Sequence, residues 1–216
     1  MNPRSRGGRA IGTSDRRRRE LEERERALLD AAISLMHRDD WETVTVEEIA
    51  RRAEYAKGTV YRHFPSKDDL HARLVADWNA GTCAALENLD ADRPFETVLR
   101  DFVAVAWQRL TADRAHARLC QHAHDADFRA RLAPASRVAL TEADARLLGL
   151  AAGLIDWGVA EGAIPRAPLA PRLFAVTGLL LGALRLAPLW SGDAALPDPE
   201  RTTADAILAL LRTGTA

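Results

Sequence analysis

The sequence has few lysines, few cysteines and almost no net charge. Lysine supplies only two of its 30 basic residues, Lys57 and Lys67, and 31 acidic residues bring the formal net charge to −1. A protein that holds a polyanion through its overall charge needs a clear basic excess. The composition therefore excludes nucleic-acid binding through the charge of the whole chain and leaves only local basic patches. One such patch is residues 1–19, where seven arginines accompany a single acid.

Other absences narrow the class of protein further. The two cysteines, Cys83 and Cys120, show no motif spacing, which favours a reducing cytoplasm over a disulfide framework. No apolar stretch follows the N-terminal arginines, so we expect no secretory signal. Residues 173–190 form the most apolar segment, but a threonine, an arginine and a proline interrupt it, whereas a membrane span needs about 20 mainly apolar residues. We therefore expect a buried helix, no membrane contact and a cytoplasmic location.

Apolar residues recur at helical spacing along most of the chain, and neither a strand pattern nor an internal repeat stands out. Phe95, Val98, Leu99 and Phe102, for example, follow the i, i+3, i+4, i+7 progression of an amphipathic helix. We predict an all-α protein with about nine helices. They cover residues 15–38, 46–53, 57–63, 67–89, 95–110, 114–124, 134–161, 171–187 and the segment after 199. The expected organisation is a disordered basic arm over residues 1–14, a first domain over 15–89 and a second over 90–216.

Residues 45–67 carry the most informative local signals. Thr45 and Glu48 have the spacing of a capping box, so a helix should start directly after Thr45. A second short helix fits residues 57–63, with its apolar side chains inward and a proline behind it. Ser66 is placed to cap a third helix that begins at the next residue. Two short helices in this order are typical of a helix-turn-helix, whose second helix lies in the major groove of DNA.

Residues 57–67 have the sequence KGTVYRHFPSK, and residues 43–50 have the sequence TVTVEEIA. These two runs resemble the tetracycline-repressor (TetR) family of bacterial transcriptional regulators. The resemblance implies a three-helix helix-turn-helix DNA-binding domain that leads into helix four, followed by a helical ligand-binding and dimerisation domain. The chain departs from the family pattern at Glu54, where a glycine is usual in the turn. It departs again at Ala56, where a serine or threonine usually caps the recognition helix.

The polar side chains of this segment are the candidates for DNA contact. Lysine and arginine reach guanine edges or phosphates, hydroxyls reach phosphates, and a glycine lets the backbone approach closely. The predicted DNA-binding residues are Thr45, Lys57, Gly58, Thr59, Tyr61, Arg62, His63 and Lys67. We place those of residues 57–63 on the outer side of the recognition helix. The alternative is a structural helix pair whose polar residues are only solvated.

Two further groups of residues have open alternatives. The arginines Arg4, Arg6, Arg9 and Arg16–Arg19 either follow the minor groove as an arm or form a solvated tail. Trp107, Cys120, His124 and Trp157 are candidates to line a small-molecule cavity, with plain core packing as the alternative. His116 and Cys120 share a helix face, but no carboxylate lies at firm ligand spacing. No metal site, cofactor or enzymatic activity is therefore predicted, since no oxyanion feature accompanies the cysteine and histidines either.

The segment 171–187 predicts self-association. Gly178 and Gly182 form a small-xxx-small pair that lets a second helix approach closely. A helix that is apolar on all sides must bury all of them. The predicted dimerisation residues are Gly178, Leu181, Gly182, Ile207 and Leu211, from this helix and the last one. The alternative is a helix buried within the single chain.

Together these features predict a ligand-responsive DNA-binding regulator. The expected form is a homodimeric repressor that binds a palindromic operator in double-stranded DNA, at the bacterial nucleoid, and is released by a small molecule. The alternative is a helical protein that binds or sequesters small molecules and has weak or lost DNA affinity, for which Glu54 and Ala56 are the sequence support.

Overall fold

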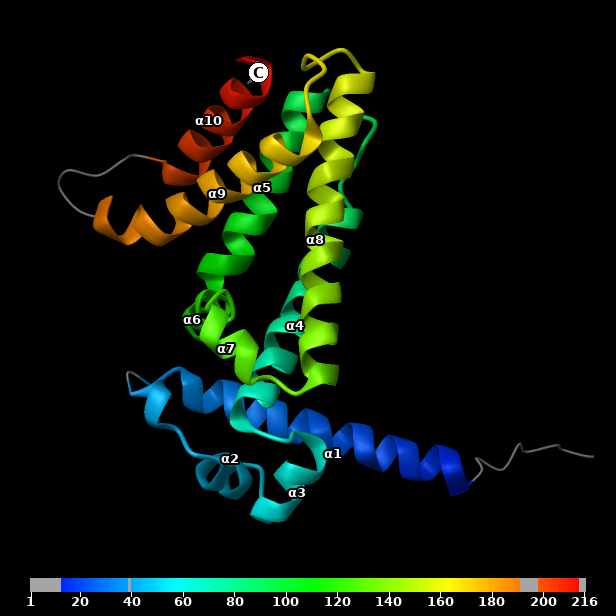
Figure 1. Cartoon of the computed structure of the whole chain (residues 1–216), viewed down its shortest axis with the longest axis vertical. Coiled ribbons are helices and arrows are strands. Elements are labelled where there is room, and N and C mark those ends of the chain that lie inside the picture. Colours follow the sequence, from blue (N-terminus) through cyan, green and yellow to red (C-terminus); the bar gives the residue numbers. More distant parts are fainter. Residues whose placement is uncertain (1–12, 39, 191–197, 214–216) are drawn as a thin grey trace, which may run out of the picture. The chain divides into compact units, whose positions relative to one another are not determined.

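The computed structural model describes residues 13–38, 40–190 and 198–213. Within these ranges the chain is all-α, with ten α-helices, two short 3₁₀ helices and no strand. The α-helices are α1 (Thr13–Met36), α2 (Val46–Arg52), α3 (Lys57–His63), α4 (Lys67–Glu87), α5 (Phe95–Ala112), α6 (Arg114–His122), α7 (Ala126–Arg131), α8 (Pro134–Ala160), α9 (Leu169–Leu186) and α10 (Pro199–Thr213). Figure 1 shows their order along the chain. The all-α prediction is confirmed, and α7 is the helix that the sequence reading missed.

The chain forms two compact units, Met1–Leu70 and His71–Ala216. The division falls within α4, whereas the sequence analysis placed all of this helix in the first domain. Side-chain contacts explain the difference, because the later part of α4 is tied to helices of the second unit. Asn79 of α4 donates to Asp144 of α8 at 2.9 Å, and Arg146 of α8 pairs with Glu87 of α4 at 2.7 Å.

The first unit is built around buried apolar side chains from α1, α2 and α3. Its core includes Leu28, Ala32, Met36, Ile49, Val60 and Phe64, all between 0% and 5% exposed. α1 begins at Thr13 and includes the four arginines Arg16–Arg19, of which Arg16 and Arg18 form helical ion pairs with Glu20 and Glu22. These arginines are therefore part of a helix rather than of an irregular arm. Arg4, Arg6 and Arg9 lie outside the described residues.

In the second unit, α5, α9 and α10 pack together around one apolar cluster. The cluster contains Phe95, Leu99, Val103, Ile155, Ile164, Ala204, Ile207, Leu208 and Leu211. Ile207 and Leu211 are 0% exposed within the single chain, so their predicted role in dimerisation is wrong. Helical periodicity identifies an apolar face, but it does not tell which neighbour covers that face.

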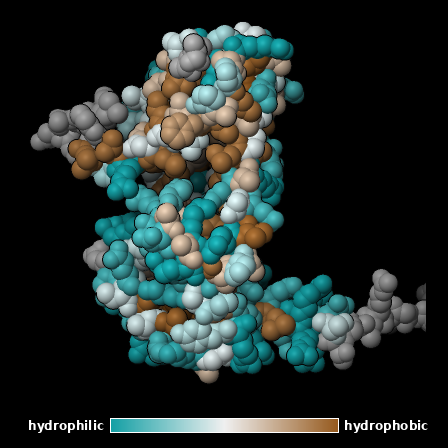
Figure 2. All heavy atoms as spheres, viewed as in Figure 1, coloured by the Kyte–Doolittle hydropathy of each residue, from teal (hydrophilic) through white to brown (hydrophobic). Residues whose placement is uncertain are grey.

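α9 differs from the expectation of a buried helix. Its only buried residue is Arg172, which donates to the carbonyl oxygen of Leu211 at 3.2 Å. Phe174 is 82% exposed, and Figure 2 shows hydrophobic side chains gathered on the face over α9. By length and composition alone, Leu169–Leu189 could cross a membrane, and it is the one such segment in the described part of the chain. It packs against α5, α8 and α10 of the same unit.

Candidate functional site: a helix-turn-helix and a ligand cavity

The start of α2 has the predicted capping box. The Oγ1 of Thr45 accepts a hydrogen bond from the backbone N–H of Glu48 at 3.2 Å. In return, the backbone N–H of Thr45 donates to the Glu48 carboxylate at 2.8 Å. This backbone N–H has the largest effect in lowering the pKa of Glu48, followed by the Thr45 hydroxyl, which donates to the same carboxylate at 3.0 Å. The side chain of Thr45 is therefore occupied in holding the first turn of α2.

The turn between α2 and α3 contains the one described non-glycine residue with a positive φ, Glu54 at 60°. The N–H of Glu54 donates to the Arg51 carbonyl at 3.2 Å, and the N–H of Tyr55 donates to the Ala50 carbonyl at 2.9 Å. This is the hydrogen-bond pattern of a Schellman motif, which usually places glycine in the left-handed position. α8 ends in the same pattern with Gly162 at φ 72°.

α3 covers the residues that the sequence predicts, and its apolar side faces the core. Val60 and Phe64 are 1% and 5% exposed. Its N-cap residue, Ala56, makes no side-chain cap hydrogen bond, as expected from its lack of a polar side chain. Ser66 caps α4 as predicted, with its Oγ accepting from the N–H of Asp69 at 3.1 Å. The local sequence signals therefore position the recognition helix.

The exposed side of α3 presents Lys57, Gly58, Tyr61 and Arg62. A Cβ at Gly58 would meet no other atom of the chain within 4 Å, so the backbone here is open to a close partner. The Lys57 ammonium lies 5.7 Å from the centre of the Tyr61 ring. It also forms an ion pair with Glu47 of α2, which raises the pKa of Lys57 and lowers that of Glu47. A phosphate or base edge that binds Lys57 therefore competes with the Glu47 carboxylate for the ammonium group.

Three predicted DNA-contact residues make contacts within the protein. Thr59 is only 8% exposed and accepts from Arg62 at 3.2 Å, so it faces inward. The His63 side chain is 9% exposed, and its Nδ1 lies 3.8 Å from a carboxylate oxygen of Glu25. Lys67 donates to the backbone carbonyls of Glu42 and Val44 at 2.8 and 3.0 Å. Placing Thr59 and His63 on the outer side was wrong, because α3 also packs along these positions.

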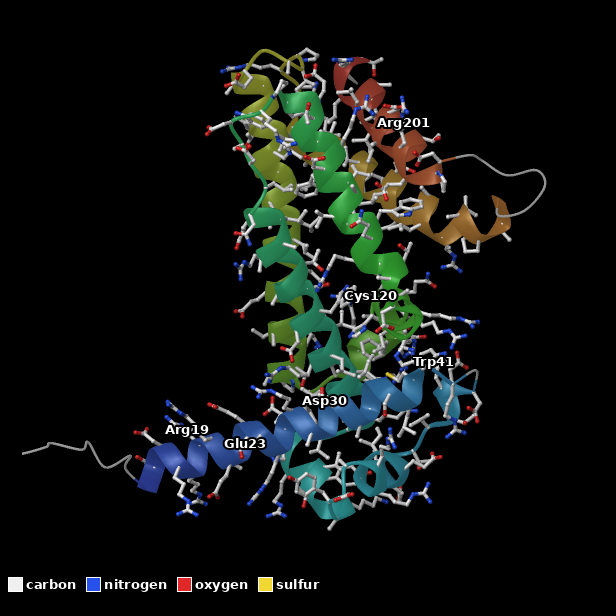
Figure 3. All side chains as sticks on the ribbon, turned by 180° about the vertical axis from the view of Figure 1, so that it is seen from behind. Arg19, Glu23, Asp30, Trp41, Cys120 and Arg201 are labelled. Atoms are coloured by element: carbon white, nitrogen blue, oxygen red, sulfur yellow. The ribbon has the colours of Figure 1, made fainter. Side chains whose placement is uncertain are left out.

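The second unit contains a cavity of about 350 Å³. Its lining residues include Trp78, Asn79 and Thr82 of α4, together with apolar side chains of α5, α8 and α9. Of the four residues predicted to contact a ligand, Cys120 and His124 line the cavity, and Cys120 is labelled on α6 in Figure 3. Trp107 is 7% exposed and not among the lining residues, and Trp157 packs edge-on against Phe95 at 5.7 Å between ring centroids. These two tryptophans are core residues, as the alternative interpretation held.

Five polar residues of this cavity were not predicted from the sequence: Asn79, Thr82, Arg129, Asp144 and Thr177. Asn79 did carry a signal, because it interrupts the apolar series of Val75 and Cys83 at helical spacing. Arg129 belongs to α7, the helix that was not predicted.

The histidines near Cys120 serve separate contacts. His116 stacks on Trp78 with the ring centroids 4.3 Å apart, and His122 lies against Phe128 at 4.7 Å. In the described ranges no group of three or more histidine, cysteine or acidic residues could hold a metal ion.

The open face of α9 contains the two glycines predicted for dimerisation. A Cβ at Gly178 or at Gly182 would meet no atom within 4 Å. Phe174, Leu186 and Leu189 are more than half exposed and lie at helical spacing along the same element and its extension. Leu181, by contrast, lines the cavity. The apolar face that remains without a neighbour in the single chain is therefore narrower than the sequence suggested.

The fold and the geometry of residues 45–67 define the first unit as a helix-turn-helix domain of the type found in DNA-binding regulators. Comparison with known proteins agrees, because residues 28–74 match the family described as bacterial regulatory proteins, tetR family. The match covers 47 of the 216 residues and includes the whole helix-turn-helix.

Relatives and solved structures extend the comparison. The transcriptional repressor KstR of Rhodococcus jostii is 39% identical over 66 residues, which is 31% of this chain and 31% of the relative. The match thus spans about a third of that protein's length. FadR of Bacillus subtilis, solved with stearoyl-CoA, has a TM-score of 0.66 at 18% identity, covering 88% of this chain and 98% of that chain. RolR, solved with resorcinol, has a TM-score of 0.64 at 20% identity, covering 89% of each chain. These structures share the fold across both units.

Proposed function

We propose that this protein is a transcriptional repressor that binds a palindromic operator as a homodimer and releases it when a small molecule enters the second unit. The observation that carries the proposal is the recognition helix α3. Its apolar side is fixed by Val60 and Phe64, while Lys57, Gly58, Tyr61 and Arg62 are exposed. Such a helix suits the major groove, where lysine and arginine read guanine edges and phosphates. The relative KstR of Rhodococcus jostii is itself named a transcriptional repressor.

The homodimer is supported by α9. An apolar helix surface with Phe174 82% exposed is costly in water, and a second copy would remove it. The open backbone at Gly178 and Gly182 allows two such helices to approach closely. In a symmetric dimer the two recognition helices would read half-sites about 34–36 Å apart, or one turn of DNA. The palindrome follows from this two-fold symmetry.

Release by a ligand is supported by the place of the cavity. Trp78, Asn79 and Thr82 of α4 line it, and α4 begins at Lys67, directly after the helix-turn-helix. FadR and RolR were solved with small molecules bound. A molecule that favours a different position of α4 shifts the population of the DNA-competent form. An effector preferring the unbound form by about 2.7 kcal/mol weakens operator affinity about 100-fold.

The test is binding to the DNA upstream of the protein's own gene, titrated with salt. We expect specific binding by a dimer that weakens as salt rises, because phosphate contacts release counterions. The double variant K57A/Y61A should lose it, since both side chains are exposed and neither supports the core. Arg201→Ala is the matched control, because Arg201 is an exposed cation of the second unit, on α10 in Figure 3.

The repressor would be refuted if the wild type bound upstream DNA no more tightly than random DNA and K57A/Y61A bound both equally well. That result would favour a protein that sequesters small molecules. Ala56 and Glu54, which weaken the cap and the turn of the recognition helix, are the features that would suit such a protein. A cytoplasmic location is part of the proposal, since operator DNA is found there.

A further inference from the structure

The cavity of the second unit has one polar end in otherwise apolar surroundings. Most of its lining consists of aliphatic and aromatic side chains from α4, α5, α8, α9 and α10. Its polar lining residues are Asn79, Thr82, Cys120, His124, Arg129, Asp144 and Thr177. Arg129 and Asp144 are the only fully charged residues among the described lining residues. The charge balance of the cavity therefore depends on this pair.

Asp144 is the centre of the polar end. One carboxylate oxygen accepts from the Asn79 side-chain amide at 2.9 Å, and the other accepts from Arg129 at 2.6 Å. Arg129 is fixed further by its Nε, which donates to the carbonyl oxygen of Ala123 at 2.7 Å. Both charged side chains are less than a third exposed. The negative and positive charges thus cancel within the wall, and each carboxylate oxygen keeps a lone pair for one more donor.

The neighbouring titratable groups are neutral near pH 7. Burial raises the pKa of the Cys120 thiol to about 12, with a smaller effect of Asp144 in the same direction. Desolvation lowers the pKa of His124, so its imidazole is uncharged and offers one donor and one acceptor. His124 is exposed and also lines the cavity.

We propose that the effector is an uncharged, mainly apolar molecule with one hydroxyl group, and that this hydroxyl binds at Asp144. The inference rests on the proposed function and specifies the ligand class of its cavity. The hydroxyl donates to the free lone pair of Asp144 and accepts from Asn79 or His124. A carboxylate or an ammonium would add an uncompensated charge beside a pair that is already neutral, at a high desolvation cost. The volume of about 350 Å³ suits a small molecule of two or three rings.

The test uses four probes on one carbon skeleton: naphthalene, 2-naphthol, 2-naphthoate and 2-naphthylmethylammonium. Binding to the DNA-free dimer is measured by calorimetry at pH 7. We expect 2-naphthol to bind at least about tenfold more tightly than each of the other three, since a hydrogen bond to a charged group is worth about 1.5–3 kcal/mol. Equal or tighter binding of the acid or the amine, or no binding of 2-naphthol, overturns the proposal.

Variants of the pair make the test specific. Asp144→Asn leaves Arg129 uncompensated, so the preference should move to 2-naphthoate. Arg129→Gln leaves Asp144 uncompensated, so it should move to the ammonium probe. The double variant R129Q/D144N restores neutrality, and the charged probes should again be the weaker ligands. Unchanged preferences in both Asp144→Asn and Arg129→Gln would overturn the role of the pair, and either of these two variants is enough to decide if it folds.

Calorimetry without DNA keeps this inference separate from the proposed function. If 2-naphthol binds as expected but does not change operator affinity, the proposed ligand class stands and the proposed release by a ligand is refuted. If operator binding is specific but the probes show no preference for the hydroxyl, the proposed DNA-binding function stands and the proposed ligand class is refuted.

Discussion

Glu54 occupies the left-handed position that ends α2, and replacing it tests whether the turn of the helix-turn-helix is strained. Its φ of 60° and the paired hydrogen bonds of Glu54 and Tyr55 complete a Schellman motif. The left-handed region costs a residue with a Cβ roughly 1–2 kcal/mol. The same chain uses Gly162 for the equivalent position after α8. Glu54→Gly should therefore relieve the strain without removing any contact of the folded state that the structure assigns to this side chain.

The expected gain is smaller than the strain itself. Glycine has more conformational freedom in the unfolded chain, and this lowers the free energy of unfolding by roughly 0.5–1 kcal/mol. The net change in the free energy of unfolding should then be an increase of about 0.5–1 kcal/mol. Urea denaturation followed by circular dichroism measures it, and the slope with urea should stay constant because the surface exposed on unfolding is the same.

Two further variants separate strain from charge. Glu54→Ala removes the carboxylate but keeps the Cβ, so it should leave the free energy of unfolding nearly unchanged. Glu54→Asn should fall between alanine and glycine, since asparagine tolerates the left-handed region better than most residues. If Glu54→Ala stabilises as much as Glu54→Gly, the carboxylate and not the backbone is responsible, and the reasoning is refuted.

Three other changes should have measurable effects. Ala56→Ser supplies the missing cap of α3 and should raise the free energy of unfolding by about 1 kcal/mol, measured by urea denaturation; no gain would mean that the cap site is already satisfied. Gly178→Leu should leave the fold intact but shift the dimer to monomer in light scattering, whereas Gly149→Leu, equally open on α8, should not; an unaffected dimer places the interface elsewhere. The pKa of Glu48 is lowered by its bonds from Thr45, so its contribution to stability is present above the ordinary pKa of 4.5 and is lost as the pH falls through the folded value. Glu48→Gln should therefore show a weaker fall of stability between neutral and acidic pH, and an identical pH profile for wild type and variant would contradict this.

Most of the helix-turn-helix could be predicted from the sequence because its signals act within a few residues. The capping box of Thr45, the start and end of α3 and the Ser66 cap all depend on hydrogen bonds between near neighbours. Helix ends are set by such local bonds to otherwise unpaired backbone groups. The strained turn at Glu54 is also a local feature, because glycine usually occupies the position directly after a helix end.

Which face of each helix is covered was decided by the tertiary structure. Periodicity marked Ile207 and Leu211 as apolar, but only the packing of α10 against α5 buries them within the chain, while Phe174 stays exposed. Thr59 and His63 turn inward for the same reason, since the small α3 is packed on more than one side.

The polar end of the cavity depended on the tertiary structure most of all. Asn79 and Asp144 lie 65 residues apart in the sequence, and Arg129 and Asp144 lie 15 apart on different helices. No local rule joins them, because their contact depends on how α4, α7 and α8 pack. The sequence alone determined the recognition element and all the helices except α7, through short-range hydrogen bonding and periodicity. The fold decided which faces are free and which charges meet, because burial and pairing are set by neighbours distant in the chain.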